Sequence, residues 1–595
     1  MSGRRDGHSP PLGGLPIELW MHLLQFVPHR DLPTCCRVSK LVRSLATPLL
    51  YRRLWLRDQL RLQKVFTVLG TRPHLSALVR VVEIRVFPFG IQAEHLERLE
   101  IAIINTFKHA VNLEELIWTR TGSFIPRTGF QRFRNDRVLR TIFEKISRLR
   151  LLELTGDSRS WSPDLLIEKL PAVIERLSLV MPDRAVTERI PLIAKRLGPN
   201  LSSLSILSNN AAYIRDASIE AAAPFLSNLS RLSLVGCKNV TGAAILSVLK
   251  RSQMDVTELS LEGLSLTPVE VDQIAKLTTK LRTLAITHPP KSISSTEFYS
   301  SLGVWVEHTH HLRRFTFYRM SGEVAAPDED QDASDEEDDE AGVEQEAEPS
   351  ASIMAINQTV PDPNLTTSVP GGTLAAGAGA DDAAEESLLP FSSLQINSPH
   401  LQRLQDQPSA PQPFTGTVLL SRQAVGRGPS DPLLPTSFLR RLIDARGAYL
   451  TQLRIHRIAM TVEQLGYICH HCGQLEDLVV HLFEPEWDTI KAHLSSLPRL
   501  QSVHILASLR SGIELNEDSL RDLAVSSSET LRQIGFRNRV WEVIPLLDQG
   551  ASSPTSTIQH PFEEQAQNVS KRNVVLRRWD AAQGNWPEAF LVVRV

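Results

Sequence analysis

The sequence predicts an α/β solenoid, with parallel strands on a concave face and helices on a convex face, behind a small N-terminal helical unit. Three observations predict this fold class. An apolar spacing recurs along most of the chain, and a hydroxyl residue followed by a proline precedes several of the intervening helical stretches. One long segment carries acidic residues without lysine or arginine. The first two features give one strand and one helix per repeat, and the third interrupts the array.

The recurring spacing consists of an apolar residue, two variable residues, a second apolar residue, one variable residue and a third apolar residue. Between Leu149 and Leu281 successive copies start 25, 27, 28, 27 and 25 residues apart, a period typical of leucine-rich repeats. The thirteen copies begin at Val81, Leu113, Leu149, Ile174, Leu201, Leu229, Val256, Leu281, Leu312, Leu450, Leu475, Leu500 and Leu531.

A turn and a helix follow each predicted strand. In the copy that begins at Leu229, Thr241 is placed to cap a helix over Gly242–Lys250, and Thr267-Pro268 and Ser162-Pro163 repeat a cap before a first-turn proline. One strand and one helix cannot bury an apolar face alone, so the copies must stack. The copy containing Cys237 resembles the cysteine-containing class of leucine-rich repeats. The stacked copies predict a curved solenoid in two blocks, residues 59–320 and 431–548.

Residues 14–58 form a separate short unit with helical signals. Leu15-Pro16-x-Glu18 starts a first helix, because proline is tolerated in a first turn and an acidic residue suits the positive end of the helix dipole. The apolar pattern predicts two further helices, the last of which runs until Pro48. Three short helices cannot enclose a core that stands alone, so the unit is expected to pack against something else.

Five short motifs lie close together in this unit: Leu15-Pro16-x-Glu18, Leu23-Leu24, Asp31-Leu32, Val38-Ser39-Lys40 and Leu45-Ala46-x-Pro48-x-x-Tyr51. Together they resemble an F-box. Val42 departs from that pattern, because many F-boxes carry tryptophan at this position. The resemblance implies docking on the Skp adaptor of a cullin–RING ubiquitin ligase. The adaptor-binding residues it implies are Leu15, Pro16, Leu19, Leu23, Leu24, Leu32 and Val38.

Composition indicates a soluble protein of a reducing compartment, in the cytoplasm, the nucleus or both. No apolar run approaches the ~20 residues that span a bilayer, and the first residues lack the apolar core of a signal peptide, so no membrane partner is expected. The cysteines are too few and too clustered for a disulfide framework. They are Cys35, Cys36, Cys237, Cys469 and Cys472.

Residues 321–430 are expected to form a disordered acidic insertion, residues 1–13 a disordered tail, and residues 549–595 a connector and C-terminal cap. Residues 321–390 contain nineteen Asp and Glu and no Lys or Arg, which leaves +16 on the remainder of a chain of formal charge −3. Three interpretations of the acidic run stay open. It is a solvated loop, a regulated segment in which Ser334 resembles an acidophilic kinase site, or an internal decoy for a basic surface.

A basic surface is predicted on the repeats that flank the insertion. Variable strand residues face the concave side because successive side chains alternate, and here they are mostly basic or aromatic, whereas earlier strands carry serine and glutamate. We expect this surface to bind an acidic or phosphorylated segment of a protein substrate, since arginine offers two parallel donors to an oxyanion. Arginines extended over an ordinary solvent-exposed face are the alternative. The predicted residues are Arg314, Tyr318, Arg319, Arg454, His456, Arg457 and Arg537, with His481 and His504 beside them.

No catalytic, metal or cofactor site is predicted. Cys469-His470-His471-Cys472 has zinc-like spacing, but a structural zinc needs four ligands and the nearest others, His481 and His493, are single. No glycine-rich phosphate loop lies between a strand and a helix, and no serine has a Gly-x-Ser-x-Gly context.

These features favour the substrate-recognition subunit of an SCF-type ubiquitin ligase. The F-box would hold the Skp adaptor and, through it, cullin and the RING subunit, while the repeats hold a protein substrate. The chain itself would supply proximity, and other subunits the chemistry. Two alternatives stay open. One is an interaction scaffold without a role in ubiquitination, and the other is nucleic-acid binding by the positively charged body, which lacks a known nucleic-acid motif.

Overall fold

The computed structural model describes the chain in several stretches: residues 15–56, 59–85, 93–118, 135–156, 158, 161–208, 213–253, 255–320, 432–483, 487–507, 516–537, 539–546 and 574–578. All of them belong to one compact unit, Met1–Val324 with Ser409–Val595. The predicted tail 1–13, the insertion 321–430 with Ser334, and most of the connector and cap 549–595 lie outside the described residues.

Three helices form the N-terminal unit: α1 Ile17–Gln25, α2 Leu32–Cys35 and α3 Lys40–Arg52. The prediction that the third helix ends at Pro48 was wrong, because α3 continues past this proline to Arg52. A proline inside a helix removes one backbone hydrogen bond. Ala46 and Tyr51 on either side of it are buried, so packing of the apolar face outweighs the lost bond.

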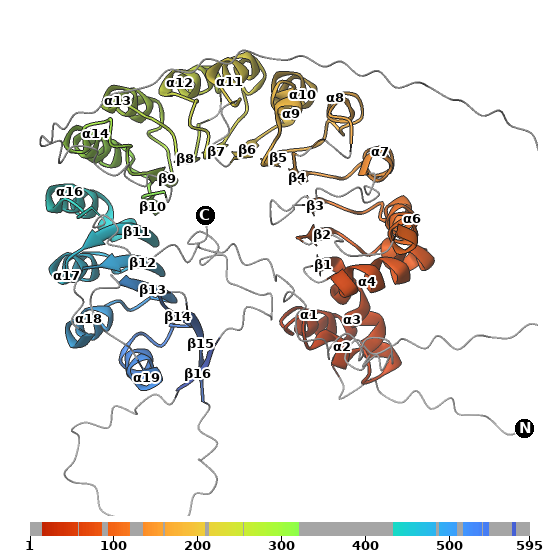
Figure 1. The fold of residues 1–595 in the computed structure, drawn as a ribbon. Coiled ribbons are helices and arrows are strands. Elements are labelled where there is room, and N and C mark those ends of the chain that lie inside the picture. The colour runs from red at the N-terminus through yellow and green to blue at the C-terminus, as the bar shows by residue number, and fades with distance from the viewer. Residues whose placement is uncertain are drawn as a thin grey trace, which may run out of the picture. The chain divides into compact units, whose positions relative to one another are not determined.

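A single sheet runs through the described residues, with its 16 strands side by side in chain order (Figure 1). Strands β1 to β14 are parallel, and β15 and β16 complete the sheet in antiparallel pairing. The strands are β1 Arg53–Leu56, β2 Val81–Ile84, β3 Glu115–Trp118, β4 Leu151–Thr155, β5 Arg176–Val180, β6 Ser203–Leu207, β7 Arg231–Val235, β8 Glu258–Glu262, β9 Thr283–Thr287, β10 Arg314–Tyr318, β11 Gln452–Met460, β12 Asp477–Leu482, β13 Ser502–Ala507, β14 Gln533–Phe536, β15 Arg539–Pro545 and β16 Val574–Arg578.

Helices connect successive strands and lie on the outer side of the curved sheet, while the strands line its inner side (Figure 1). The α-helices are α4 Gln59–Thr71, α5 Pro73–Ser76, α6 Ala93–His109, α7 Asn135–Lys145, α8 Asp164–Glu168, α9 Arg184–Thr187, α10 Ile190–Leu197, α11 Asp216–Ala222, α12 Gly242–Arg251, α13 Pro268–Leu277, α14 Ser295–His308, α16 Thr436–Arg446, α17 Val462–His471, α18 Trp487–Leu494 and α19 Glu517–Ser526. Short 3-10 helices are η3 Gly198–Asn200, η4 Ala223–Phe225 and η5 Gly447–Tyr449. The predicted fold class, a leucine-rich-repeat solenoid, is confirmed.

The recurring apolar residues form ladders in the core between strands and helices. Leu152 and Leu177 pair across β4 and β5, and Leu204 and Leu232 across β6 and β7, and all four are buried. Burying a leucine side chain fully contributes about 1.5–3 kcal/mol. The repeated spacing is therefore the main source of cohesion along the array.

The second strand lies in a different frame from the predicted one. The sequence pattern placed the apolar residues at Val81, Ile84 and Val86, but Val82 pairs with Leu116 and the buried frame is Val79-x-x-Val82-x-Ile84. Both frames carry three apolar residues, so the spacing alone does not separate them. Packing against the helices decides, because it buries Val79 and Val82 almost completely.

An additional strand, β1, precedes the predicted array. Leu54 and Leu56 pair with Val82 and Ile84 of β2, and with Tyr51 they form one more copy of the spacing at the end of α3. The solenoid core therefore begins within the predicted N-terminal unit 14–58. The two parts share residues rather than being joined by a linker.

The two blocks of repeats meet directly across the insertion. Strand β10 pairs with β11 in parallel, with Phe315 opposite Leu453 and Tyr318 opposite His456. On the helical side, Arg441 of α16 donates to the Glu307 carboxylate of α14 at 2.6 and 2.8 Å. The strand register continues from β10 to β11 as it would across an ordinary loop. Lengthening a loop adds only a small entropic cost of closure, so the insertion need not disturb the stacking of the repeats.

Side-chain hydroxyls accept backbone hydrogen bonds at the helix starts in all three predicted places. Thr241 accepts a hydrogen bond from the backbone N–H of Ala243 at the start of α12. Thr267 begins α13 with a capping box, in which it accepts from the Glu270 N–H and the Glu270 carboxylate accepts from the Thr267 N–H. Helix α8 begins at Asp164, one residue later than expected, and the Ser162 hydroxyl accepts a hydrogen bond from the Asp164 N–H at 3.4 Å.

Replacing Thr267 by alanine is expected to lower the free energy of unfolding by about 1 kcal/mol, because it removes both side-chain bonds of this residue. Urea unfolding followed by circular dichroism measures the change. Thr267→Ser is the matched control and should stay close to the parent protein, since serine caps equally well. Equal destabilisation by both substitutions would show that the hydroxyl is not responsible.

An antiparallel hairpin ends the sheet. Strand β15 pairs with β14, and β16 pairs with β15, so that Ile534 lies opposite Trp541 and Val543 opposite Leu576. Strand β16 lies within residues 549–595, where the sequence predicted a connector and C-terminal cap, whereas β15 was not predicted.

Candidate functional site

Helix α1 and its flanks carry a cluster of exposed apolar side chains, called here the α1 face. Phe26 is 73% exposed, and Leu19 and Leu23 are each 48% exposed. Exposed apolar clusters of this kind mark interaction sites on soluble proteins. The α1 face comprises Leu15, Ile17, Leu19, Met21, Leu23, Phe26 and, at the end of the turn after α2, Val38.

The buried residue of α1, Leu24, packs in a small core of the N-terminal unit. This core consists of Leu24, Leu32, Cys36, Val42 and Ala46, all of them buried. Ser39 fixes the start of α3, because its hydroxyl accepts a hydrogen bond from the Val42 N–H at 3.1 Å. Because this core is small, the three helices that support the α1 face gain only modest stability from buried apolar area.

Five of the seven predicted adaptor-binding residues lie exposed: Leu15, Pro16, Leu19, Leu23 and Val38. Leu24 and Leu32 do not, since they are only 4% and 3% exposed within the small core. The structure therefore gives these two leucines a supporting role instead of a contact.

The sequence prediction omitted three members of the α1 face: Ile17, Met21 and Phe26. The distribution of apolar residues around α1 could have predicted the exposure of these three side chains. A short amphipathic helix buries one stripe, whereas the apolar residues of α1 lie on both sides of the stripe that contains Leu24.

The comparison with known families decides what this unit is. Residues 12–52 match the F-box domain. The match ends where α3 ends, and it contains the whole α1 face and the small core. F-box domains bind Skp adaptors. The rest of the chain, beyond the F-box, is the solenoid.

Comparisons over the whole chain add little. The leucine-rich repeat-containing protein LegL7 from Legionella pneumophila is similar in structure, with 16% identity and a TM-score of 0.31. That alignment covers 45% of this chain and 83% of LegL7. No curated protein matches the sequence. The assignment of the solenoid therefore rests on its own sheet order and register.

Predicted substrate-binding residues come together on the concave side of β10 and β11. The Tyr318 ring stacks on the His456 ring, with centroids 4.4 Å apart and planes 14° from parallel. Arg454 and Arg457 lie close enough to act on the His456 ring electrostatically. Arg314 begins β10, Arg319 follows it, and Arg537 follows β14. We call Tyr318, Arg454, His456 and Arg457 the β10–β11 cluster.

Carboxylates reduce the positive charge that the sequence predicted for this surface. Arg454 Nε donates to Asp477 Oδ2 at 3.1 Å, and Arg314 Nη2 lies 3.4 Å from Glu258 Oε1. The Tyr318 hydroxyl donates to the Glu262 carboxylate two strands away. Carboxylates on neighbouring strands therefore offset part of the positive charge of this surface.

Burial keeps His456 and His504 uncharged. His456, His481 and His504 are 3%, 7% and 3% exposed. Burial, reinforced by Arg457 and Arg454, lowers the pKa of His456 to about 3, and burial lowers the pKa of His504 to about 4. Both imidazoles are neutral at physiological pH, so the predicted basic character of these histidines was wrong.

These lowered pKa values predict that acidification destabilises the solenoid. An unfolded imidazole binds a proton below pH ~6.5, whereas the folded one stays neutral to about pH 3 or 4, so the unfolded state gains protons first. Each imidazole should cost about 2 kcal/mol of stability between pH 7 and pH 5. Urea titrations at both pH values measure the difference. His456→Phe, which keeps a ring against Tyr318, should lose part of this dependence, and an unchanged slope would contradict the assignment.

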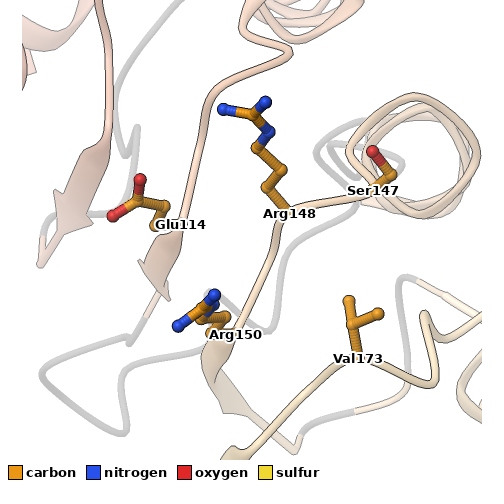
Figure 2. A pocket seen from close by; sticks show the side chains of 5 residues that line it. All are labelled: Glu114, Ser147, Arg148, Arg150 and Val173. Carbon is orange, nitrogen blue, oxygen red and sulfur yellow. The ribbon is translucent and has the colours of Figure 1, made fainter.

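A hollow of about 360 Å³ lies elsewhere, near the starts of β3 to β5, and Figure 2 shows its lining. Its charged side chains already have partners. Arg150 pairs with Glu175 at 3.7 Å, Arg148 donates to the Asn112 amide oxygen at 3.2 Å, and Glu114 pairs with Arg80. We assign no chemistry to this hollow. It is lined by Glu114, Ser147, Arg148, Arg150 and Val173.

Cys469 and Cys472 are buried at the end of α17, and burial raises the pKa of each thiol to about 12. Within the described ranges, no three or more His, Cys, Asp or Glu side chains are grouped to hold a metal ion. The same part of the chain contains no helix with the length and apolar character of a membrane span.

Proposed function

We propose that this chain is a substrate-recognition subunit of an SCF-type cullin–RING ubiquitin ligase. The observation that carries the proposal is the α1 face, a set of exposed apolar side chains inside the residues that match an F-box. The adaptor binds there, chiefly on Leu15, Pro16, Leu19, Leu23 and Val38, and brings cullin and the RING subunit. Ubiquitin transfer then depends on holding a substrate close, and this chain supplies no catalytic group.

The concave face of the solenoid holds the protein substrate. Two features support this role. Adjacent parallel strands present a continuous surface, as repeat proteins do in binding extended partners. The β10–β11 cluster, with Arg314, Arg319 and Arg537 near it, adds aromatic and cationic side chains, which are enriched where interfaces bind tightly.

Affinity purification of the full chain from cells tests the proposal. Adaptor, cullin and RING subunit should be recovered together, and proteasome inhibition should increase the amount of ubiquitinated protein recovered with them. Recovery of partners without adaptor or cullin would favour the alternative, a scaffold without a role in ubiquitination. Deleting residues 14–54 is unsuitable as a control, because Tyr51 and Leu54 belong to the solenoid core. Point substitutions on the α1 face avoid that damage.

A further inference from the structure

A buried imidazole without a hydrogen-bond partner lies within the β10–β11 cluster. Neither ring nitrogen of His456 has a hydrogen-bond partner, although the residue is only 3% exposed. A neutral imidazole carries one N–H donor and one acceptor, and leaving buried polar atoms unsatisfied is costly and uncommon. His456 is therefore a candidate donor for a bound molecule. Its orientation is fixed, because Tyr318 stacks on one face of the ring and is itself tied to Glu262.

The charges around His456 favour an anionic ligand. The guanidinium groups of Arg457 and Arg454 both act on the ring in the direction that disfavours a proton on it, so the charged side chains nearest the imidazole are cationic. Asp477 compensates Arg454. Among the described residues no carboxylate forms an ion pair with Arg457, so its guanidinium is available to an anion.

Arg457 has a left-handed backbone at the place in the repeat where Gly236 and Gly263 also have one. Strand β11 shifts register against β12 between Ile455 and Ala459, and Arg457 in this bulge has a left-handed backbone with φ of 56°. Bulges redirect side chains and occur often beside binding sites. A left-handed arginine is disfavoured by about 1 kcal/mol or more, so a smaller residue would suit the fold better. Arg457 is also partly exposed, whereas His456 is buried.

We propose that His456 and Arg457 form a subsite that holds an oxyanion, a carboxylate or a phosphate, of a protein bound on the concave face. The inference rests on the proposed function in assuming that a protein partner lies on this face. Arg457 meets the anion at the surface with its forked guanidinium, and the His456 N–H donates from below. Tyr318 is a positioning residue, since it orients the imidazole.

Peptide binding to the full chain, purified with its adaptor, tests the subsite. Three fluorescent pools of otherwise random sequence carry phosphoserine, glutamate or serine at one fixed position, and anisotropy at low and high salt measures their affinity. The phosphoserine pool, the glutamate pool or both should bind at least ~10-fold more tightly than the serine pool. Which of the two prevails tells phosphate from carboxylate. Equal binding of all three pools, or no binding, would overturn the proposal.

Three substitutions locate the effect. Arg457→Gly should remove the preference while favouring the fold, because glycine accepts the left-handed backbone. His456→Phe keeps the stack on Tyr318 and should reduce the preference several-fold. Arg251→Ala, on the exposed end of α12, makes the same change in net charge and should leave the preference intact. A preference that persists in Arg457→Gly overturns the subsite. Adaptor recovery from the same samples reports on the F-box separately, so the two proposals fail independently.

Discussion

Replacing Leu19 and Leu23 together by aspartate is expected to abolish capture of the Skp adaptor, with at least a ~100-fold loss of affinity. Central apolar side chains of an interface often contribute 2 kcal/mol or more each. Burying an unpaired carboxylate in their place adds a further penalty. Both leucines are about half exposed in the F-box, so the substitutions leave its small core intact. Calorimetric titration of purified adaptor into the full chain measures the loss.

Two controls define this result. Val269→Asp changes an apolar side chain on α13 that is 64% exposed, and it should leave adaptor binding unchanged. Leu24→Ala should also weaken binding, but through loss of helical structure in the F-box, which circular dichroism detects. Adaptor binding that survives in Leu19→Asp/Leu23→Asp with full helicity would remove the main support for the proposed function.

The fold could be predicted from the sequence because its signal repeats. One copy of the apolar spacing is ambiguous, as the two overlapping frames at Val79 and Val81 show. Many copies at a steady period leave one solution, a stack of parallel strands. The wrong predictions concern segments whose structure the repeat period does not determine. The β1 copy overlaps the end of α3, and Pro48 inside α3 is tolerated only because both sides of it are packed.

The candidate sites could be predicted in part. The motifs in residues 12–52 gave the right helix for the α1 face, but a helix must bury one side, and the motifs do not tell which leucines those are. On the concave face, alternation placed Arg454 and His456 correctly. Their charges were misjudged because the partners, Asp477 among them, come from neighbouring strands and depend on the register. The bulge at Arg457 has no sequence signature that we recognise.

Replacing Phe438 by alanine is expected to lower the free energy of unfolding by about 3–5 kcal/mol, the usual cost of emptying a packed aromatic site. Phe438 lies on α16, the first helix after the insertion, and its ring is buried among aromatic rings of the preceding repeats. Its centroid lies 5.4 Å from Tyr299, 6.3 Å from Phe315 and 6.0 Å from Phe317. It therefore joins the two blocks of repeats.

The shape of the unfolding curve is the sharper observable for Phe438→Ala. Stability in a repeat array is close to a sum of repeat and interface terms, so weakening one interface should uncouple the blocks on either side of it. Urea unfolding should then broaden, with a lower m-value, or divide into two steps. Phe483→Ala, at a phenylalanine that is 44% exposed, is the matched control and should keep one sharp transition. If Phe438→Ala also unfolds in one sharp step at an unchanged midpoint, the two blocks are not coupled through this cluster, and the continuous register from β10 to β11 must be held by backbone pairing alone.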